Sequence, residues 1–200
     1  MIGKETVFGV GYLNGEKPCN KGSCEYEYQI WSSMLQRCYG SVEAFKYHND
    51  CSVSDNFKDY SYFKMWCNQQ IGFNCRDGKK GLFHLDKDLL SNDARIYSEE
   101  TCCFIPAEIN CALPSPKGLN KTLALPLGVS KRKDRVKFSA TLACYGRVKH
   151  LGSFTTVEEA VDVWKVAKSL YFLELAEKWK DIVDPRVYSA LVERANSLQP

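Results

Sequence analysis

The feature that most constrains the fold is a stretch rich in proline and glycine that divides the chain in two. Residues 114–120 contain two prolines, a glycine and an asparagine, a composition typical of linkers and turns. Before this stretch the apolar residues recur mainly at helical spacing, and after it short strand-like segments come before the helices. The sequence therefore predicts two domains, which cover residues 1–117 and 118–200.

Two helices are predicted in the N-terminal domain from apolar residues spaced three or four apart. The first covers residues 25–39 and stops at Gly40, and the second covers residues 55–70, with Asp55 as its cap and Gly72 just past its end. The apolar faces consist of Trp31, Met34, Leu35 and Cys38 in the first helix and Phe57, Tyr60, Phe63, Trp66 and Cys67 in the second. We expect these faces to form a core.

A strand, strand, helix order is predicted next. Residues 82–88 and 95–97 have the pattern of two strands, and the polar turn at residues 91–93 between them favours a hairpin. A short helix is expected over residues 106–113, because Pro114 would stop it.

The C-terminal domain is predicted to hold three strands and two helices. The strands fall near residues 128–131, 136–143 and 147–153. A capping box at residues 156–159 opens the next helix, and the pair Asp184-Pro185 opens the last one. The predicted fold class is α+β: N-terminal helices with a hairpin and helix, then a small three-stranded antiparallel sheet packed on a helix, with a final C-terminal helix.

Charge is distributed unevenly along the chain. Residues 121–150 hold eight Lys and Arg residues and one acid, Asp134, which is a local net charge of +7. Since the whole chain carries +3, the remainder carries −4. A basic region of this density indicates a polyanionic partner such as a nucleic acid, and a solvated basic face is the alternative.

The ten cysteines do not have the spacing of a zinc site. They include no C-x-x-C pair, and the adjacent Cys102 and Cys103 cannot easily ligate one ion together. Several fall at apolar helical positions, where a free thiol is a small buried hydrophobe. Neither a secretory signal nor a run of apolar residues long enough for a membrane span is present. We therefore expect no zinc, no membrane association, reduced thiols and a cytoplasmic location.

The C-terminal motifs resemble a known DNA-binding module. Residues 128–132, 137–141 and 151–160 are similar to the Apetala-two or ethylene-response-factor type of domain, and the resemblance covers residues 127–175. It implies a three-stranded sheet that binds double-stranded DNA, mainly at phosphates. The strands lack the tryptophans of the plant domains, so no base preference is carried over. The residues implied to face DNA are Lys131, Arg132, Arg135, Lys137, Ser139, Thr141, Arg147 and Lys149.

The N-terminal motifs resemble the HNH-related, phage-encoded endonucleases, which include homing enzymes and often carry an Apetala-two-like domain behind the nuclease. The matching segments are residues 31–39, 57–69, 85–88 and 97–110, within a resemblance that covers roughly residues 10–113. The resemblance implies a phage protein of the bacterial host cytoplasm. It also implies a hairpin and helix that hold one Mg²⁺ or Mn²⁺ ion.

The same resemblance implies roles for five residues. Asp86 matches the metal ligand of the strand, Asn110 matches the ligand of the helix, and Thr101 stands where an orienting Asn is often found; such oxygen ligands suit Mg²⁺. Lys87 replaces the general-base His. Because neighbouring acids favour its charged form, Lys87 would hold a phosphate or mark an inactive site. His84 lies two residues before Asp86, on the same side of a strand, and is the alternative base.

Two functions remain open from the sequence. The first is a metal-dependent DNA endonuclease. The second is a catalytically inactive protein that keeps the nuclease fold as a DNA-binding or protein-binding factor, which the residues at 87 and 101 favour. The protein is expected to be a monomer or a weak dimer. A protein partner for the C-terminal helices is a further alternative, although core packing explains their aromatic residues more simply.

Overall fold

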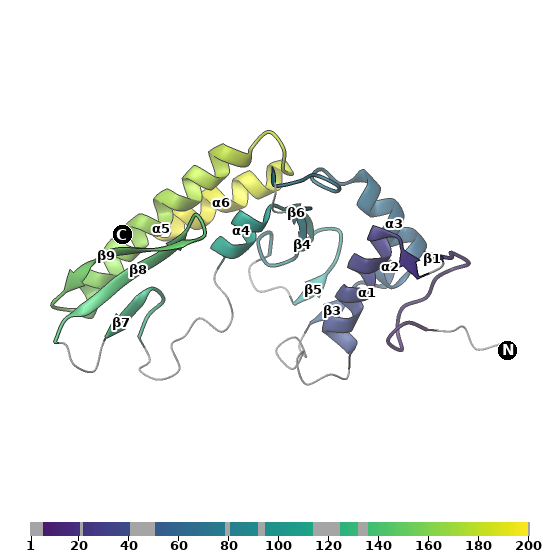
Figure 1. Cartoon of the computed structure of the whole chain (residues 1–200), viewed down its shortest axis with the longest axis horizontal. Coiled ribbons are helices and arrows are strands. Elements are labelled where there is room, and N and C mark those ends of the chain that lie inside the picture. The colour runs from purple at the N-terminus through teal and green to yellow at the C-terminus, as the bar shows by residue number, and fades with distance from the viewer. Residues whose placement is uncertain are drawn as a thin grey trace. The chain divides into compact units, whose positions relative to one another are not determined.

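The structure is a computed structural model that describes residues 6–20, 22–40, 51–78, 81–91, 95–113, 125–131 and 136–199. Across these residues the fold is α+β, with six helices and four small sheets (Figure 1). The chain divides into two compact units, Met1–Phe104 and Ile105–Pro200. The predicted linker at 114–120, with the predicted domain boundary inside it, lies outside the described residues.

The first helix of the N-terminal unit is confirmed. Helix α1 (Tyr26–Tyr39) ends at Gly40, and its side chains Trp31, Met34 and Leu35 are buried. The Trp31 indole donates a hydrogen bond to the Phe57 carbonyl at 2.7 Å. The buried face of α1 therefore packs on the segment that follows β3 (Ser52–Val53).

The single helix predicted over residues 55–70 is wrong, because it is two helices. Helix α2 (Asp55–Lys58) is capped by Ser54 rather than by Asp55, and helix α3 (Tyr60–Gln69) is capped by Asp59. The Asp59 backbone is extended, with φ −85° and ψ 114°, and its carboxylate accepts a hydrogen bond from the Ser61 amide at 2.9 Å. Asp and Ser side chains compete with helix continuation in this way because they bind nearby backbone groups themselves.

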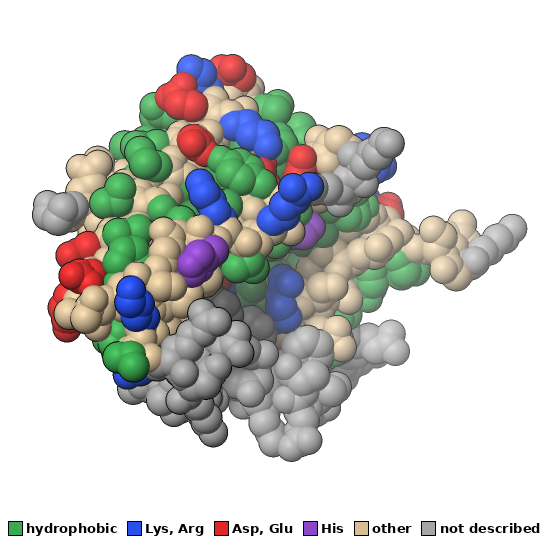
Figure 2. Space-filling view, turned by 60° about the vertical axis from the view of Figure 1, so that its left-hand side comes forward, with side chains coloured by type: hydrophobic (Ala, Val, Ile, Leu, Met, Phe, Trp, Pro, Cys, Tyr) green, Lys and Arg blue, Asp and Glu red, His purple; other side chains and the backbone are tan. Residues whose placement is uncertain are grey.

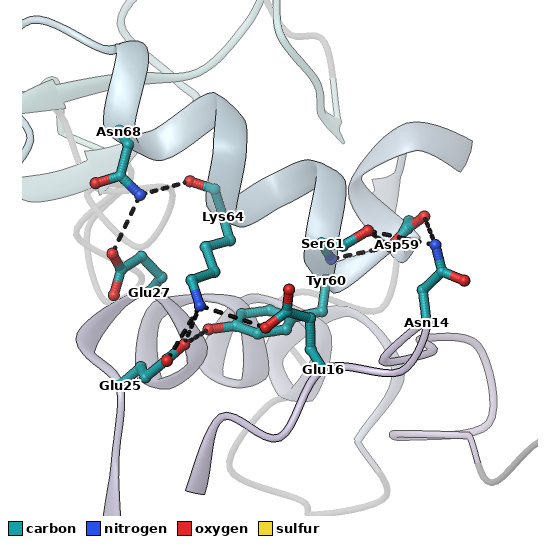
Figure 3. Close-up of polar contacts among 9 residues, drawn as sticks. All are labelled: Asn14, Glu16, Glu25, Glu27, Asp59, Tyr60, Ser61, Lys64 and Asn68. Atoms are coloured by element: carbon teal, nitrogen blue, oxygen red, sulfur yellow. Dashed lines mark hydrogen bonds and ion pairs between the residues drawn. The ribbon is translucent and has the colours of Figure 1, made fainter.

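The aromatic core predicted for this segment is confirmed. Its members are Phe57, Tyr60, Phe63, Trp66 and Cys67, and all are buried. A polar network covers one side of this core (Figure 3). There the Tyr60 hydroxyl donates to Glu25 at 2.6 Å, and the Lys64 ammonium lies 2.8 Å from the same carboxylate. These contacts join α3 to Glu25, the residue just before α1.

The strands of the N-terminal unit pair differently from the prediction. Strand β4 (His84–Asp86) pairs with β6 (Cys103–Ile105), and β5 (Ile96–Tyr97) pairs in parallel with β3. The predicted hairpin between residues 82–88 and 95–97 is therefore wrong. Strand β6 was not predicted, yet all three of its residues are buried. Burial of this apolar segment beside β4 outweighs the closeness of β4 and β5 along the chain.

The expectation that all thiols are reduced is wrong at one pair. Strands β1 (Cys19–Asn20) and β2 (Ser23–Cys24) are antiparallel, and their register places Cys19 opposite Cys24. Directly opposed residues point to the same side of a sheet, and these two form a disulfide with a Cα–Cα distance of 4.0 Å. The other eight cysteines are free.

The C-terminal unit follows the predicted order closely. Its elements are α4 (Ala107–Ala112), β7 (Val129–Lys131), β8 (Phe138–Cys144), β9 (Arg147–Phe154), α5 (Val157–Trp179) and α6 (Pro185–Ser197). The three strands form an antiparallel sheet in the order β7-β8-β9. The capping box of α5 and the Asp184 cap of α6 are both present. Figure 1 shows α5 running along the sheet and α6 lying beside α5.

A small core joins the sheet to α5. It is built on Val129, Ala140 and Ala160, which are all buried. Gly128 allows the close approach: its φ is +75°, and a Cβ there would lie 2.0 Å from the indole nitrogen of Trp164. None of the helices in the described part of the chain combines the length and apolar character needed to cross a membrane.

Candidate nucleic-acid interface and metal site

The strand register shows which side chains share the face of the sheet that points away from α5. Ala140 lies in the core with α5 and stands opposite Val129 and Gly152. Because neighbouring residues of a strand point to opposite faces, the next row lies on the other face, which we call the open face. That row is Ser130, Ser139 and Ser153.

Two more rows continue the open face. Thr141 stands opposite His150, and Ala143 stands opposite Val148. The Ser139 hydroxyl lies 3.2 Å from His150 Nδ1, so the first two rows are joined by a hydrogen bond. Apart from His150, the side chains of these rows are short. Another surface can therefore approach the backbone of the sheet closely.

The residues predicted to face DNA fall on both sides of the sheet. Ser139 and Thr141 belong to the open face. Lys131, Arg147 and Lys149 instead stand opposite residues of the α5 side. For Lys131 this placement is supported by its ammonium, which lies 4.7 Å from the centroid of the Phe138 ring.

The cations are nevertheless accessible. Lys131, Lys137, Arg147 and Lys149 are all exposed, with Lys137 just before β8. The described residues 129–131 and 136–154 contain these four cations and no acid, so this segment carries a net positive charge. Figure 2 brings this part of the molecule forward and shows Lys and Arg at its surface. Arg132 and Arg135 lie outside the described residues.

Sequence reasoning missed part of the open face. The missed residues are Ser130, Ala143, Val148, His150 and Ser153. Strand alternation counted from the turn at residues 145–146 would have grouped Ala143, Val148 and His150, whereas Ser153 lies beyond a register shift and Ser130 lies on β7. Tyr145 and Gly146 have φ of 51° and 71°, as a two-residue hairpin turn requires. Such a turn fixes the register of the two strands that it joins.

Asp86, the proposed metal ligand of the strand, is held by the backbone that follows it. The residue is 7% exposed. Its Oδ1 accepts hydrogen bonds from the amides of Leu89 at 2.8 Å and Asp88 at 3.1 Å. Burial raises the pKa of Asp86, and the Leu89 amide opposes this rise. A divalent cation nearby would favour the ionised form, and a carboxylate is an oxygen ligand of the kind that Mg²⁺ prefers.

Lys87 is fixed beside Asp86. Its ammonium forms an ion pair with Asp88 and lies 5.5 Å from the centroid of the Tyr97 ring. Burial lowers the pKa of Lys87, but the Asp88 carboxylate raises it by more than burial lowers it. The pKa of Lys87 therefore lies above its ordinary value. The Lys87 ammonium therefore stays charged, and this side chain is suited to binding an anion rather than to accepting a proton.

The other two candidates near Asp86 have different surroundings. His84 begins β4 and is exposed, although it shares the strand with the buried Asp86. The Thr101 hydroxyl donates to the Ile96 carbonyl at 2.7 Å and accepts from the Ser98 amide at 3.0 Å. Thr101 therefore closes the turn that leads from β5 to β6.

Asn110, the proposed ligand of the helix, lies on α4 in the C-terminal unit, whereas Asp86 lies in the N-terminal unit. Two contacts hold α4 on α5. Lys168 donates a hydrogen bond to the Ala112 carbonyl, and Glu108 accepts one from the Trp179 indole at 3.1 Å. Within the described residues, no group of three or more His, Cys, Asp or Glu side chains is arranged to hold a metal ion.

Comparisons of the chain with protein-family models, with curated proteins and with solved structures find no match.

Proposed function

We propose that this protein binds double-stranded DNA through the open face of β7-β8-β9. The observation that carries the proposal is that this face lies opposite α5, has short side chains, and belongs to a sheet segment whose described residues, 129–131 and 136–154, hold four exposed cations and no acid. A small β-sheet fits the major groove of DNA, and cations at its margins can reach the phosphates on both sides.

The second part of the proposal is hydrolysis of phosphodiester bonds with one Mg²⁺ or Mn²⁺ ion. The paired strands β4 and β6, which β5 separates along the chain, come before α4, with Asp86 at the end of β4 and Asn110 on α4. Carboxylate and amide oxygens suit Mg²⁺, which when bound would offset charge on the scissile phosphate.

The chain's own groups supply the remaining functions. The Leu89 and Asp88 amides orient the Asp86 carboxylate. A phosphate oxygen would have to replace Asp88 as the partner of the charged Lys87. His84, exposed at the start of the same strand, is the candidate to accept a proton from water.

A plasmid assay tests hydrolysis. Purified protein is incubated with supercoiled plasmid and Mg²⁺ or Mn²⁺, with a chelator as the metal-free control. The wild type is expected to nick the DNA, and Asp86→Ala and Asp86→Asn are expected not to. The Asn variant keeps an oxygen for the Leu89 amide but removes the negative charge, which separates loss of the charged ligand from loss of structure. Asp55→Asn, a change to an exposed carboxylate of the same unit, should nick normally. Equal nicking by the Asp86 variants, or none on many DNA substrates, would contradict this part of the proposal.

A catalytically inactive DNA-binding protein is the second candidate. It is favoured by Lys87 and Thr101, which replace residues of the endonuclease pattern and are each committed to local contacts. Calorimetry distinguishes the two candidates. DNA binding without any divalent-ion binding would favour the inactive protein. Ion binding that is lost in both Asp86→Ala and Asn110→Ala would favour the nuclease.

A further inference from the structure

The last row of the open face is apolar and fully accessible. Val148 is 72% exposed and stands opposite Ala143, which is also exposed. A single exposed valine is ordinary on a protein surface. This one differs because it lies on the face of a sheet whose other accessible rows are polar, between Lys149 and Arg147 along its own strand.

The neighbouring turn leaves this row clear. The Tyr145 ring packs edge-on against Tyr171 of α5 with centroids 4.9 Å apart, and its hydroxyl bonds Glu174. The bulkiest side chain of the turn is therefore held toward α5. Ala143 and Val148 remain exposed at that end of the sheet.

We infer that Ala143 and Val148 determine sequence specificity by contacting thymine methyl groups in the major groove. This inference rests on the proposed DNA binding. Thymine is the base that presents a methyl group in that groove, and small apolar side chains are suited to contact it. The cations position the sheet at phosphates, which carry no sequence information. The apolar pair adds a contact that only A·T pairs can provide.

A second copy of the chain is less suited than DNA to cover the row of Ala143 and Val148. Two side chains offer far less area than the roughly 800 Å² per partner of a stable protein interface. The four cations around the sheet would also repel the same surface on another copy. DNA is favoured because its charge is opposite.

Uracil substitution tests the inference directly, because uracil pairs like thymine but lacks the methyl group. Duplexes are first enriched from a random pool on the wild-type protein. The best binder is then synthesised with thymine or with uracil at each position. Wild-type affinity should fall about fourfold at each contacted thymine, which corresponds to about 0.8 kcal/mol for one buried methyl group.

Variants assign the effect to the apolar row. In Val148→Ser the difference between thymine and uracil should disappear at one or more positions, and Ala143→Ser should act at neighbouring positions. Val136→Ser is the matched control, because Val136 is 83% exposed but lies before β8. The control should keep the wild-type preference. Circular dichroism checks that each variant is folded.

The outcomes separate the inference from the function on which it rests. Equal binding of thymine and uracil duplexes, or a preference that persists in both serine variants, would overturn the inference alone. Failure to bind any duplex would overturn the proposed DNA binding and the inference with it. Self-association of the free protein that Val148→Ser abolishes would show that a second copy covers the row, and would also overturn it.

Discussion

The indole nitrogen of Trp179 donates a hydrogen bond to the carboxylate of Glu108, across the contact between α5 and α4. Both residues are buried, and Lys178 forms an ion pair with the same carboxylate. The helix that carries Asn110 is thereby attached to the helix that supports the sheet. Asn110 is therefore positioned by the C-terminal unit.

Glu108→Ala should destabilise the C-terminal unit by about 2 kcal/mol, because the buried Trp179 N–H would lose its acceptor. Glu108→Gln keeps an acceptor oxygen and should cost less. Unfolding in urea, followed by tryptophan fluorescence, measures both changes. Glu193→Ala is the control: Glu193 is exposed on α6, and its loss should change stability by less than about 0.5 kcal/mol. Equal effects of Glu108→Ala and Glu193→Ala would refute a structural role for the Glu108 contact.

Lys168 should make stability depend on pH in the alkaline range. Burial lowers its pKa from an ordinary 10.5 to about 8 in the folded protein. Between these values the unfolded chain binds more protons, so the free energy of unfolding rises with pH. The two pKa values differ by the equivalent of about 3 kcal/mol.

The comparison with Lys168→Met isolates this effect, because the other titrating groups are common to both proteins. The free energy of unfolding of the wild type, measured from about pH 7 to pH 10.5, should rise relative to that of the variant. Parallel curves over this range would show that the pKa of Lys168 is not lowered.

The disulfide should stabilise the N-terminal unit modestly. Cys19 and Cys24 close a short loop, for which the entropy of the unfolded chain gives about 2 kcal/mol. The double variant Cys19→Ser, Cys24→Ser should be less stable than the wild type by that amount. A reducing agent should lower the stability of the wild type but leave that of the double variant unchanged. Thiol titration of the denatured, unreduced protein should find eight free thiols, in line with the eight free cysteines. Ten thiols would contradict the bond.

Removal of a sheet cation should weaken DNA binding for all sequences alike. Lys149→Ala is expected to lower affinity and to reduce the slope of log affinity against log salt concentration by about one. Lys180→Ala is the matched control, because Lys180 lies beyond the end of α5 and pairs with Glu177. An unchanged slope for Lys149→Ala, or an equal change in the control, would show that DNA does not bind beside Lys149.

The sequence predictions were correct where the determining interactions lie between residues close together in the chain. The cap at Thr156, the cap at Asp184 and the three C-terminal strands were predicted correctly, because their determinants lie within a few residues. The hairpin of β4 was predicted with the wrong partner. Sequence spacing indicated a turn after residue 88. It did not indicate that the buried strand β6, rather than β5, pairs with β4.

The candidate sites show the same division. Asp86 and Asn110 were chosen from a resemblance, and the structure adds that the first is a buried carboxylate while the second lies on a helix fixed by Glu108 and Trp179. The cations of the sheet were evident from charge alone. His150 and Val148 were not, because a strand's face is known only when its register and its buried side are known.

By itself the sequence determined the helix faces, the caps, the three-stranded segment and the concentration of positive charge, all of which depend on neighbouring residues. Only the tertiary structure decided which strands pair, which cysteines join, and which side chains of β8 and β9 remain open opposite α5. These outcomes depend on burial of apolar surface between distant segments. Local spacing limits such pairings but does not select among them.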